Sequence, residues 1–217
     1  DLVLDFFSGS ATTAHSVIQL NREDNLNRRF ILVQISEKTP ANSEAFKAGY
    51  NTICDIGEER IRRAGKKIKD ESPLTTQDLD VGFRVFKVDS SNMKDLEQTP
   101  QSTQLSLLEN YDSTIKEGRT SLDLVIQTMI RLGIPLDAEI SRKFAEGGTE
   151  YYAVNGNDLV CCFARDVPEK DIEELARLQP LNVAFRDDSF ASDQDEVNCE
   201  QIFKTLSPIT GKNIFIL

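Results

Sequence analysis

The sequence contains no apolar run long enough to cross a membrane. None of its runs approaches the about 20 residues that a membrane-spanning helix requires, and no signal peptide is visible at its start. Apolar residues make up 39% of the chain and charged residues 28%, proportions that are typical of a soluble globular protein. These features favour a cytoplasmic protein without a membrane partner.

Residues that commonly carry catalysis or bind metals are also scarce. The only histidine is His15, and a catalytic histidine needs a carboxylate or nucleophile partner that the sequence does not identify. We therefore expect a structural or surface histidine. The four cysteines, Cys54, Cys161, Cys162 and Cys199, lack the spacing of a metal site and indicate reduced structural thiols. The adjacent Cys161 and Cys162 would face opposite sides of a strand.

Basic residues are under-represented in the second part of the chain. The net charge of −11 is unevenly distributed, because residues 1–70 carry 11 Lys and Arg against 10 Asp and Glu, whereas residues 71–217 carry 14 against 26. Proteins that bind nucleic acids normally present a basic surface. The C-terminal part is therefore not expected to form a main DNA-binding surface, and its acidity favours solubility.

The familiar glycine-rich nucleotide motifs are absent, but a related pattern opens the chain. There is no G-x-G-x-x-G after a strand and no Gly-Lys-Ser/Thr of a P-loop. Residues 1–13 instead read Asp-Leu-Val-Leu-Asp-Phe-Phe-Ser-Gly-Ser-Ala-Thr-Thr. An apolar strand that ends at Asp5 would pass through a turn at Gly9 into a helix, which directs backbone N–H groups towards a ligand. Taken alone, such a turn is equally compatible with a simple tight connection.

The first seventy residues are predicted to form an α/β unit. A strand over 1–7, a helix over 12–21 and a nearly continuous apolar strand over 28–35 indicate a right-handed parallel crossover. Rossmann-like sites hold ribose hydroxyls with a polar side chain at the end of this second strand. Gln34 and Glu37 are the candidates, and an exposed loop acid is the alternative interpretation of Glu37.

Residues 1–13 resemble motif I of the amino-methyltransferases that modify DNA, whose pattern is Asp-Pro-Phe-x-Gly-Ser-Gly-Thr-Thr. Phe6 replaces the proline, a variant familiar in the type III restriction–modification branch, and Ala11 replaces the last glycine. The resemblance implies a Rossmann-like fold that binds S-adenosylmethionine. In the wider family a Glu stands at the position of Gln34, whereas type III modification subunits have Gln there and Glu after it, so the ribose ligand stays open between the two. The cofactor-binding residues that the resemblance implies are Asp5, Phe6, Phe7, Ser8, Gly9, Ser10, Thr12, Thr13, Gln34 and Glu37.

Two further segments resemble type III modification subunits. The first is 49–64, at the start of a helix expected over 52–69 that follows a short helix over 41–49. Its charged residues indicate either a solvated helix face with internal Glu–Arg pairs or a phosphate contact. The second is the acidic run 186–190, which indicates a solvated strand end, a subunit contact or, alternatively, a metal site.

The remainder of the chain is predicted to form a second α/β unit. A polar link near 71–80 precedes an alternating segment over 81–88 that predicts a strand, and a mostly helical region follows at 103–133. The clearest helix there is 121–132, whose apolar stripe indicates core or a subunit interface. The other expected elements are a hairpin of 151–154 with 159–164, a helix over 168–178 capped near Asp166, a strand over 181–186, a helix over 195–206 and a strand over 213–217. The expected organisation is a partial methyltransferase domain over 1–75 and a smaller α/β C-terminal domain over 80–217.

A motif that the resemblance requires is missing. The seven prolines include no Pro-Pro pair, whereas methylation of an exocyclic amine in this family uses Asp/Asn/Ser-Pro-Pro-Tyr/Phe, whose aromatic residue stacks on the flipped base. In the permuted branch to which type III enzymes belong, that motif lies upstream of motif I. We therefore expect a C-terminal fragment of a longer modification subunit, with no catalytic residue in this piece.

The resemblance implies a parent enzyme that transfers a methyl group from S-adenosylmethionine to N6 of adenine. Its expected partners are DNA, through parts missing from this chain, a second modification subunit and the restriction subunit. An orphan or cytosine-N4 methyltransferase is the alternative within the same chemistry. An assembly module of the restriction–modification complex is the alternative from another class.

Overall fold

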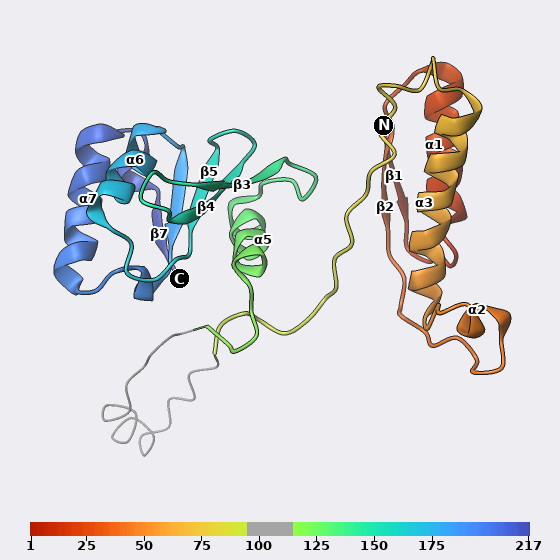
Figure 1. Ribbon diagram of the computed structural model, residues 1–217, viewed down its shortest axis with the longest axis horizontal. Helices are drawn as coiled ribbons and strands as arrows, with labels where there is room; N and C mark the ends of the chain where they lie inside the picture. Colours follow the sequence, from red (N-terminus) through yellow and green to blue (C-terminus); the bar gives the residue numbers. More distant parts are fainter. Residues whose placement is uncertain (95–114) are drawn as a thin grey trace. The chain divides into compact units, whose positions relative to one another are not determined.

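The computed structural model describes residues 1–94 and 115–217 and divides into two compact units, 1–86 and 87–217 (Figure 1). Within these ranges no helix combines the length and the apolar character that crossing a bilayer demands. The sequence predicts a mostly helical region over 103–133, and its first part, 103–114, lies outside the described residues.

The first unit contains a two-stranded parallel sheet covered on one face by two helices. Strand β1 (Leu2–Asp5) pairs with β2 (Arg29–Leu32), and helices α1 (Thr12–Asp24) and α3 (Ile53–Glu71) lie side by side (Figure 1). A short helix, α2 (Glu44–Lys47), precedes α3. The strands and the helices expected in this part of the sequence are thus confirmed, and their apolar residues form one core of Ala11, Ala14, Ile18, Phe30, Leu32, Ile61 and Ile68.

Local sequence signals explain where these helices begin. Thr52 accepts a hydrogen bond from the Asp55 amide, and the Asp55 carboxylate accepts one from the Thr52 amide, which forms a capping box at the start of α3. The buried Asn21 side chain joins α1 to β2, because its amide exchanges two 2.9 Å hydrogen bonds with the backbone of Arg28. These bonds therefore join the last turns of α1 to the start of β2, across the loop that connects them.

The opposite face of the two-stranded sheet is exposed. Leu2, Leu4, Ile31 and Val33 are between 45% and 52% accessible. The sequence of the second strand is typical of a strand buried on both faces, yet β2 alternates between exposed and half-buried residues. Parallel sheets are normally covered on both sides, so this apolar face is an unusual feature of the unit.

The strand predicted over 81–88 is wrong, because this segment runs beside α3 without a strand partner. Val81 and Phe83 pack against the core of the first unit, and the Arg62 guanidinium lies 5.4 Å from the centre of the Phe83 ring. A Cβ at Gly65 would lie 2.8 Å from Cβ of Val81, so only glycine admits this contact. The first compact unit consequently extends to Phe86.

The second unit is built on a five-stranded mixed sheet in the order β3-β4-β5-β6-β7. The first three strands are antiparallel, and the last two run parallel to β5. One face is covered by α5 and the other by α6 and α7 (Figure 1). The strands are β3 (Ile140–Phe144), β4 (Glu150–Val154), β5 (Leu159–Cys162), β6 (Asn182–Phe185) and β7 (Ile214–Ile216), and the helices are α5 (Ser121–Leu132), α6 (Glu169–Arg177) and α7 (Asp193–Leu206).

These elements confirm the expected hairpin, the three helices and the two parallel strands, whereas β3 was not predicted. The prediction that the adjacent residues Cys161 and Cys162 face opposite sides of a strand is also confirmed, because Cys161 faces α5 and Cys162 faces α6 and α7. The predicted cap of α6 is wrong. Pro168 occupies the cap position without a side-chain hydrogen bond, and Asp166 lies outside the helix with a φ of 47°.

A different carboxylate anchors the first turn of α6. Asp171 is fully buried and accepts hydrogen bonds from the amides of Gly147 (3.0 Å) and Thr149 (3.3 Å) and from the Thr149 hydroxyl. These bonds compensate the cost of burying the carboxylate. They also attach the turn between β3 and β4 to the helix.

Candidate functional site

The site begins at Asp5, the last residue of β1. One oxygen of its carboxylate accepts a hydrogen bond from the Phe7 amide at 3.1 Å, and the other accepts the Thr13 hydroxyl at 2.5 Å. Because Thr13 lies in the first turn of α1, the carboxylate holds both ends of the connection between strand and helix. The carboxyl end of a parallel strand is where open α/β sheets bind ligands.

Gly9 lies at the tip of this connection and is held by Gln34. The Gly9 backbone has a φ of 50°, in the left-handed region that favours glycine, and a Cβ there would meet no atom within 4 Å. Its amide donates a 2.7 Å hydrogen bond to Oε1 of Gln34, and Nε2 of Gln34 donates to the Ile35 carbonyl at 3.1 Å. The Ser8 amide donates to the Val33 carbonyl at 3.3 Å. The turn after β1 is therefore fixed to the end of β2.

Helix α1 begins without a side-chain cap. Ala11 occupies the cap position with a φ of 60°, and no side chain accepts a hydrogen bond from the first turn. The glycine of the family pattern at this position is explained by that left-handed conformation. Gly57 of α3 allows the close approach of Ala11, since a Cβ there would lie 3.3 Å from Cβ of Ala11. The first-turn amides of α1, which no preceding helical turn satisfies, remain available as donors.

The side chains of the other predicted site residues surround this turn without taking part in its hydrogen bonds. Phe6 and Phe7 are 61% and 88% exposed, and the Glu37 side chain is exposed beyond the end of β2. The Glu37 backbone is ordered by the Ile53 amide, which donates to its carbonyl at 3.0 Å. The structure thus links Asp5, Thr13, Phe7, Ser8, Gly9 and Gln34 through hydrogen bonds, while Phe6, Ser10, Thr12 and Glu37 lie beside them.

The role of Gln34 in the turn was not predicted from the sequence. Gln34 was expected as a possible ribose ligand, yet both ends of its amide are engaged within the protein. The sequence offers one signal, the replacement of an acidic residue by an amide, because an amide, unlike a carboxylate, can accept from Gly9 and donate to Ile35 together.

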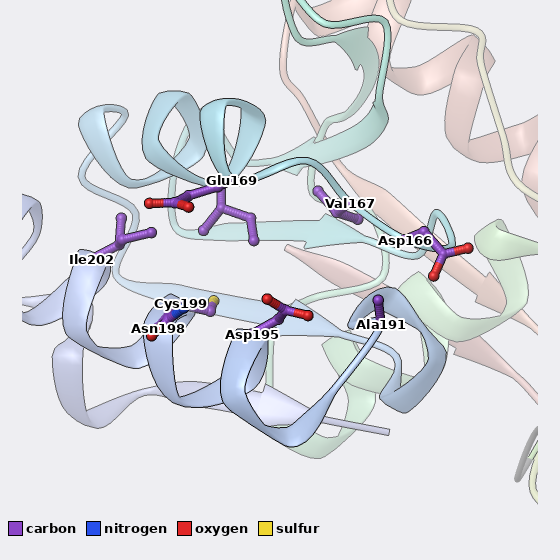
Figure 2. A pocket seen from close by; sticks show the side chains of 9 residues that line it. Asp166, Val167, Glu169, Ala191, Asp195, Asn198, Cys199 and Ile202 are labelled. Carbon is purple, nitrogen blue, oxygen red and sulfur yellow. The ribbon is translucent and has the colours of Figure 1, made fainter.

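The second unit contains a hollow of about 160 Å³ between the N-terminal parts of α6 and α7 (Figure 2). Asp166, Glu169 and Asp195 lie around it, and the Cys199 thiol forms part of its wall. Burial raises the pKa of Cys199 to about 12, so this thiol is protonated and a weak nucleophile. Among the residues that the structure describes, no group of three or more His, Cys, Asp and Glu side chains is arranged to hold a metal ion.

The acidic run that follows β6 is engaged in ion pairs. Asp188 contacts the guanidinium groups of Arg186 at 2.8 Å and Arg165 at 3.1 Å. The carboxylate therefore lies at a partly buried strand end between two cations, rather than at the solvated strand end that the sequence indicated. Burial and the nearby Asp187, Glu200 and Asp193 raise the pKa of Glu196.

Comparison with known proteins gives these geometric features a context. The chain is 46% identical over 111 residues to the Mod subunit of the type III restriction-modification enzyme StyLTI of Salmonella typhimurium, a match that covers 51% of the chain. It is 45% identical over 87 residues, or 40% of the chain, to the Mod subunit of the type III enzyme EcoP15I of Escherichia coli. The chain resembles type III Mod subunits over about half its length. The resemblance inferred from residues 1–13 and 49–64 is thereby confirmed.

The similarity extends to a methyltransferase of another type. The type II methyltransferase M.KpnI of Klebsiella pneumoniae is 36% identical over 69 residues, or 32% of the chain. These matches cover only part of each relative, namely 15% of the StyLTI Mod subunit, 12% of the EcoP15I Mod subunit and 16% of M.KpnI. No protein-family model matches the chain. The chain is thus an α/β protein similar to DNA modification subunits over a limited part of their length.

Proposed function

We propose that the chain supplies the S-adenosylmethionine-binding elements of a type III DNA adenine-N6 methyltransferase. The observation that carries this proposal is the turn in which Asp5 and Gln34 hold Gly9 at the start of an uncapped helix. The similarity to Mod subunits over about half the chain supports it, and residues 5–13 resemble the amino-methyltransferase motif. The proposed domain 1–75 contains this turn, and 80–217 forms the proposed C-terminal domain.

The residues of the turn fit the charged groups of S-adenosylmethionine. The uncapped amides at Ser10, Thr12 and Thr13 would donate to the methionine carboxylate, which the positive end of the helix dipole also favours. Gly9 leaves open space at the tip of the turn, where a side chain would obstruct the approach of a ligand. When bound, S-adenosylmethionine supplies the methyl group for transfer. The residues of this chain bind and orient the cofactor.

The ribose and adenine contacts fall to residues beyond the turn. Because the Gln34 amide is engaged by Gly9 and Ile35, we assign the ribose hydroxyls to Glu37, whose carboxylate has no hydrogen bond or ion pair within the described residues. The exposed rings of Phe6 and Phe7 supply apolar surface for the adenine. Asp5 and Ser8 shape the turn rather than contact the adenosine.

The exposed face of the first sheet supports a Rossmann-like methyltransferase sheet that is larger than two strands. Leu2, Leu4, Ile31 and Val33 present an apolar surface opposite the helices. A parallel sheet is stable when helices cover both faces, so β1 and β2 are suited to be neighbours within a wider sheet. A wider sheet would allow a further layer to bury these apolar side chains, which the first unit by itself leaves exposed.

The catalytic step requires groups that this chain does not contain. The sequence has no Pro-Pro pair with an aromatic residue to grip a flipped adenine. We therefore assign no catalytic residue here and propose that DNA, a second modification subunit and the restriction subunit interact with the complete enzyme in the cytoplasm. The chain by itself is expected to show no methyl transfer to DNA.

A titration of the chain with S-adenosylhomocysteine, followed by amide NMR, tests the cofactor site. We expect saturable shifts of the amides of 6–13, together with Gln34 and Glu37. His15, one turn further along α1, serves as an internal reference that shifts less. An absence of shifts at millimolar ligand, or shifts confined to residues 87–217, would overturn the proposal.

A second candidate function is assembly, and one observation on α5 favours it. Val125 and Met129 are fully buried, whereas Leu122 and Ile130 on the same apolar stripe are 46% and 62% exposed. Exposed apolar side chains in a row often mark a subunit contact. Sedimentation of the chain and of a Leu122→Ser, Ile130→Ser variant tests it. Self-association that the variant abolishes supports the assembly role, and a monomer in both cases removes it.

A further inference from the structure

A shallow groove of about 330 Å³ lies between α1 and α3 in the first unit. Ile56 and Ala64 contribute apolar surface to it, and Arg60, Arg63 and Lys67 line it from α3. Three cations on one side of a single helix, at spacings of three and four residues, share one helical face. The groove thus joins an apolar floor to a row of three positive charges, of which Arg63 is paired with Glu59 of the same lining.

The positive charge of this region contrasts with the rest of the chain. Residues 57–69 contain six Lys and Arg but only two acidic residues, in a chain whose net charge is −11. The internal Glu–Arg pairs that the sequence predicted are confirmed, because Glu58 contacts Arg62 at 2.9 Å and Glu59 contacts Arg63 at 2.7 Å. Glu58 and Glu59 thus neutralise Arg62 and Arg63, which are two of the six basic residues in 57–69.

The cations of the groove differ in how far they are neutralised. Arg60 is exposed and has no ion pair among the residues that the structure describes. Lys67 has one distant partner, Glu71 at 3.7 Å, and both side chains are exposed. Exposed pairs of this kind contribute little binding energy, so Arg60 and Lys67 can exchange water or a weak partner for a stronger anion.

Tyr50 orients the third cation. Its hydroxyl oxygen accepts a 2.9 Å hydrogen bond from the Arg63 guanidinium, while Glu59 binds the same group from the other side. Arg63 is consequently held in one direction at the edge of the groove. His15 from α1 completes the opposite wall. An arginine that is positioned in this way, next to an unpaired one, suits the planar recognition of phosphate oxygens.

We infer that this groove binds the phosphate backbone of DNA, an inference that rests on the proposed function. Guanidinium and ammonium groups in a row are the usual contacts to successive phosphates, and they carry no sequence preference. The apolar floor at Ile56 and Ala64 suits the sugar between phosphates. Residues 71–217 carry 14 basic against 26 acidic residues, so the basic face of α3 is the better match for phosphate groups. An acidic protein surface is the competing occupant.

Binding of the full chain to a fluorescent DNA duplex at low salt, measured by anisotropy, tests the inference. We expect weak, sequence-independent binding that tightens as the salt falls, with a Kd at physiological salt of about 10⁻⁴ to 10⁻⁶ M, the range typical of non-specific contacts. The Arg60→Ala, Lys67→Ala variant should bind about tenfold more weakly and lower the slope of log K against log salt by about 2. The matched control is Lys47→Ala, Lys143→Ala, which removes the same charge from exposed positions outside the groove.

Three outcomes would overturn the inference. These are no binding of DNA by the wild-type chain, equal weakening in both double variants, and a preference for polyglutamate over DNA that the groove variant abolishes. The affinity for S-adenosylhomocysteine is measured in the same variants. If the groove fails but cofactor binding persists, only this inference falls, whereas loss of cofactor binding in the wild-type chain contradicts the proposed function itself.

Discussion

The amide of Gly9 and the side chain of Gln34 form a 2.7 Å hydrogen bond across 25 residues of sequence. This bond joins the turn after β1 to the end of β2, so the two loops at the carboxyl edge of the sheet behave as one element. The turn is consequently held in one arrangement by the protein itself, which would reduce the entropic cost of binding a ligand there.

Replacing Gln34 by leucine should loosen this turn. The change removes the acceptor of the Gly9 amide and leaves a partly buried donor unpaired, which costs about 1 to 3 kcal/mol. We expect the affinity for S-adenosylhomocysteine to fall about tenfold and the free energy of unfolding to decrease. Calorimetry and urea denaturation measure the two effects.

Two further variants test whether the hydrogen bond to the Gly9 amide, rather than the chemical nature of the side chain, determines the affinity. Gln34→Glu retains an acceptor for the Gly9 amide and should preserve most of the affinity, whereas Gln19→Leu alters an exposed glutamine on α1 and should change nothing. Equal affinities for the wild type and Gln34→Leu would mean that the bond does not organise the site.

Replacing Gly65 by alanine should displace the chain that follows α3. The new Cβ would lie 2.8 Å from Cβ of Val81, so overpacking should cost about 1 to 3 kcal/mol. This exceeds the gain of up to about 1 kcal/mol that alanine brings to a helix. We expect faster chymotryptic cleavage after Phe83 and Phe86. Lys66→Ala, on the exposed neighbouring position, should leave cleavage unchanged, and an equally resistant Gly65→Ala would disprove the contact.

The four cysteines should differ sharply in reactivity. Cys161, Cys162 and Cys199 are buried, and burial raises the pKa of each thiol, to about 12 for Cys162 and Cys199. Cys54 is partly exposed. Alkylation with iodoacetamide followed by mass spectrometry should therefore modify Cys54 first, with the others reacting only on unfolding. Rapid modification of Cys199 would show that the hollow between α6 and α7 opens readily.

The same thiols predict a loss of stability in alkali. A buried thiol whose pKa is about 12 stays protonated in the folded chain while the unfolded chain ionises from about pH 9. Their contribution is complete below about pH 9 and declines between about 9 and 12, by about 1.4 kcal/mol per pH unit for each thiol. Urea denaturation at several pH values should show a shallower decline for Cys199→Ala, while Cys54→Ala should keep the wild-type slope.

Most elements were predictable because their signals are local. Thr52 begins α3 through its capping box, and Gly133, with a φ of 68°, ends α5 where the sequence places a helix stop. The alternation of apolar and polar residues around Val81 and Phe83 wrongly predicted a strand, because an extended chain that packs on a helix has the same period of two as a strand. Strand β3 escaped prediction because it is an edge strand whose Arg142 and Lys143 are exposed.

The turn between Asp5 and Thr13 was predictable from the sequence, but its hydrogen bonds were not. The pattern from Asp5 to Thr13 identifies the turn, since the glycine and the helix start are visible in the sequence. Which atom Gln34 binds depends on the side-chain torsions and on the distance between two strands, neither of which the sequence states. The same holds for Asp171, whose anchoring role depends on a turn 22 to 24 residues away.

Calorimetric titration of S-adenosylmethionine into the wild-type chain and an Asp5→Ala variant decides whether the turn after β1 binds the cofactor. Asp5 holds both the Phe7 amide and the Thr13 hydroxyl, so we predict measurable binding by the wild type and at least tenfold weaker binding by the variant. Asp70→Ala, which removes an exposed carboxylate at the end of α3, should bind as the wild type does. Equal affinities of all three proteins, or no binding by the wild type, would contradict the assignment of the cofactor site to this turn.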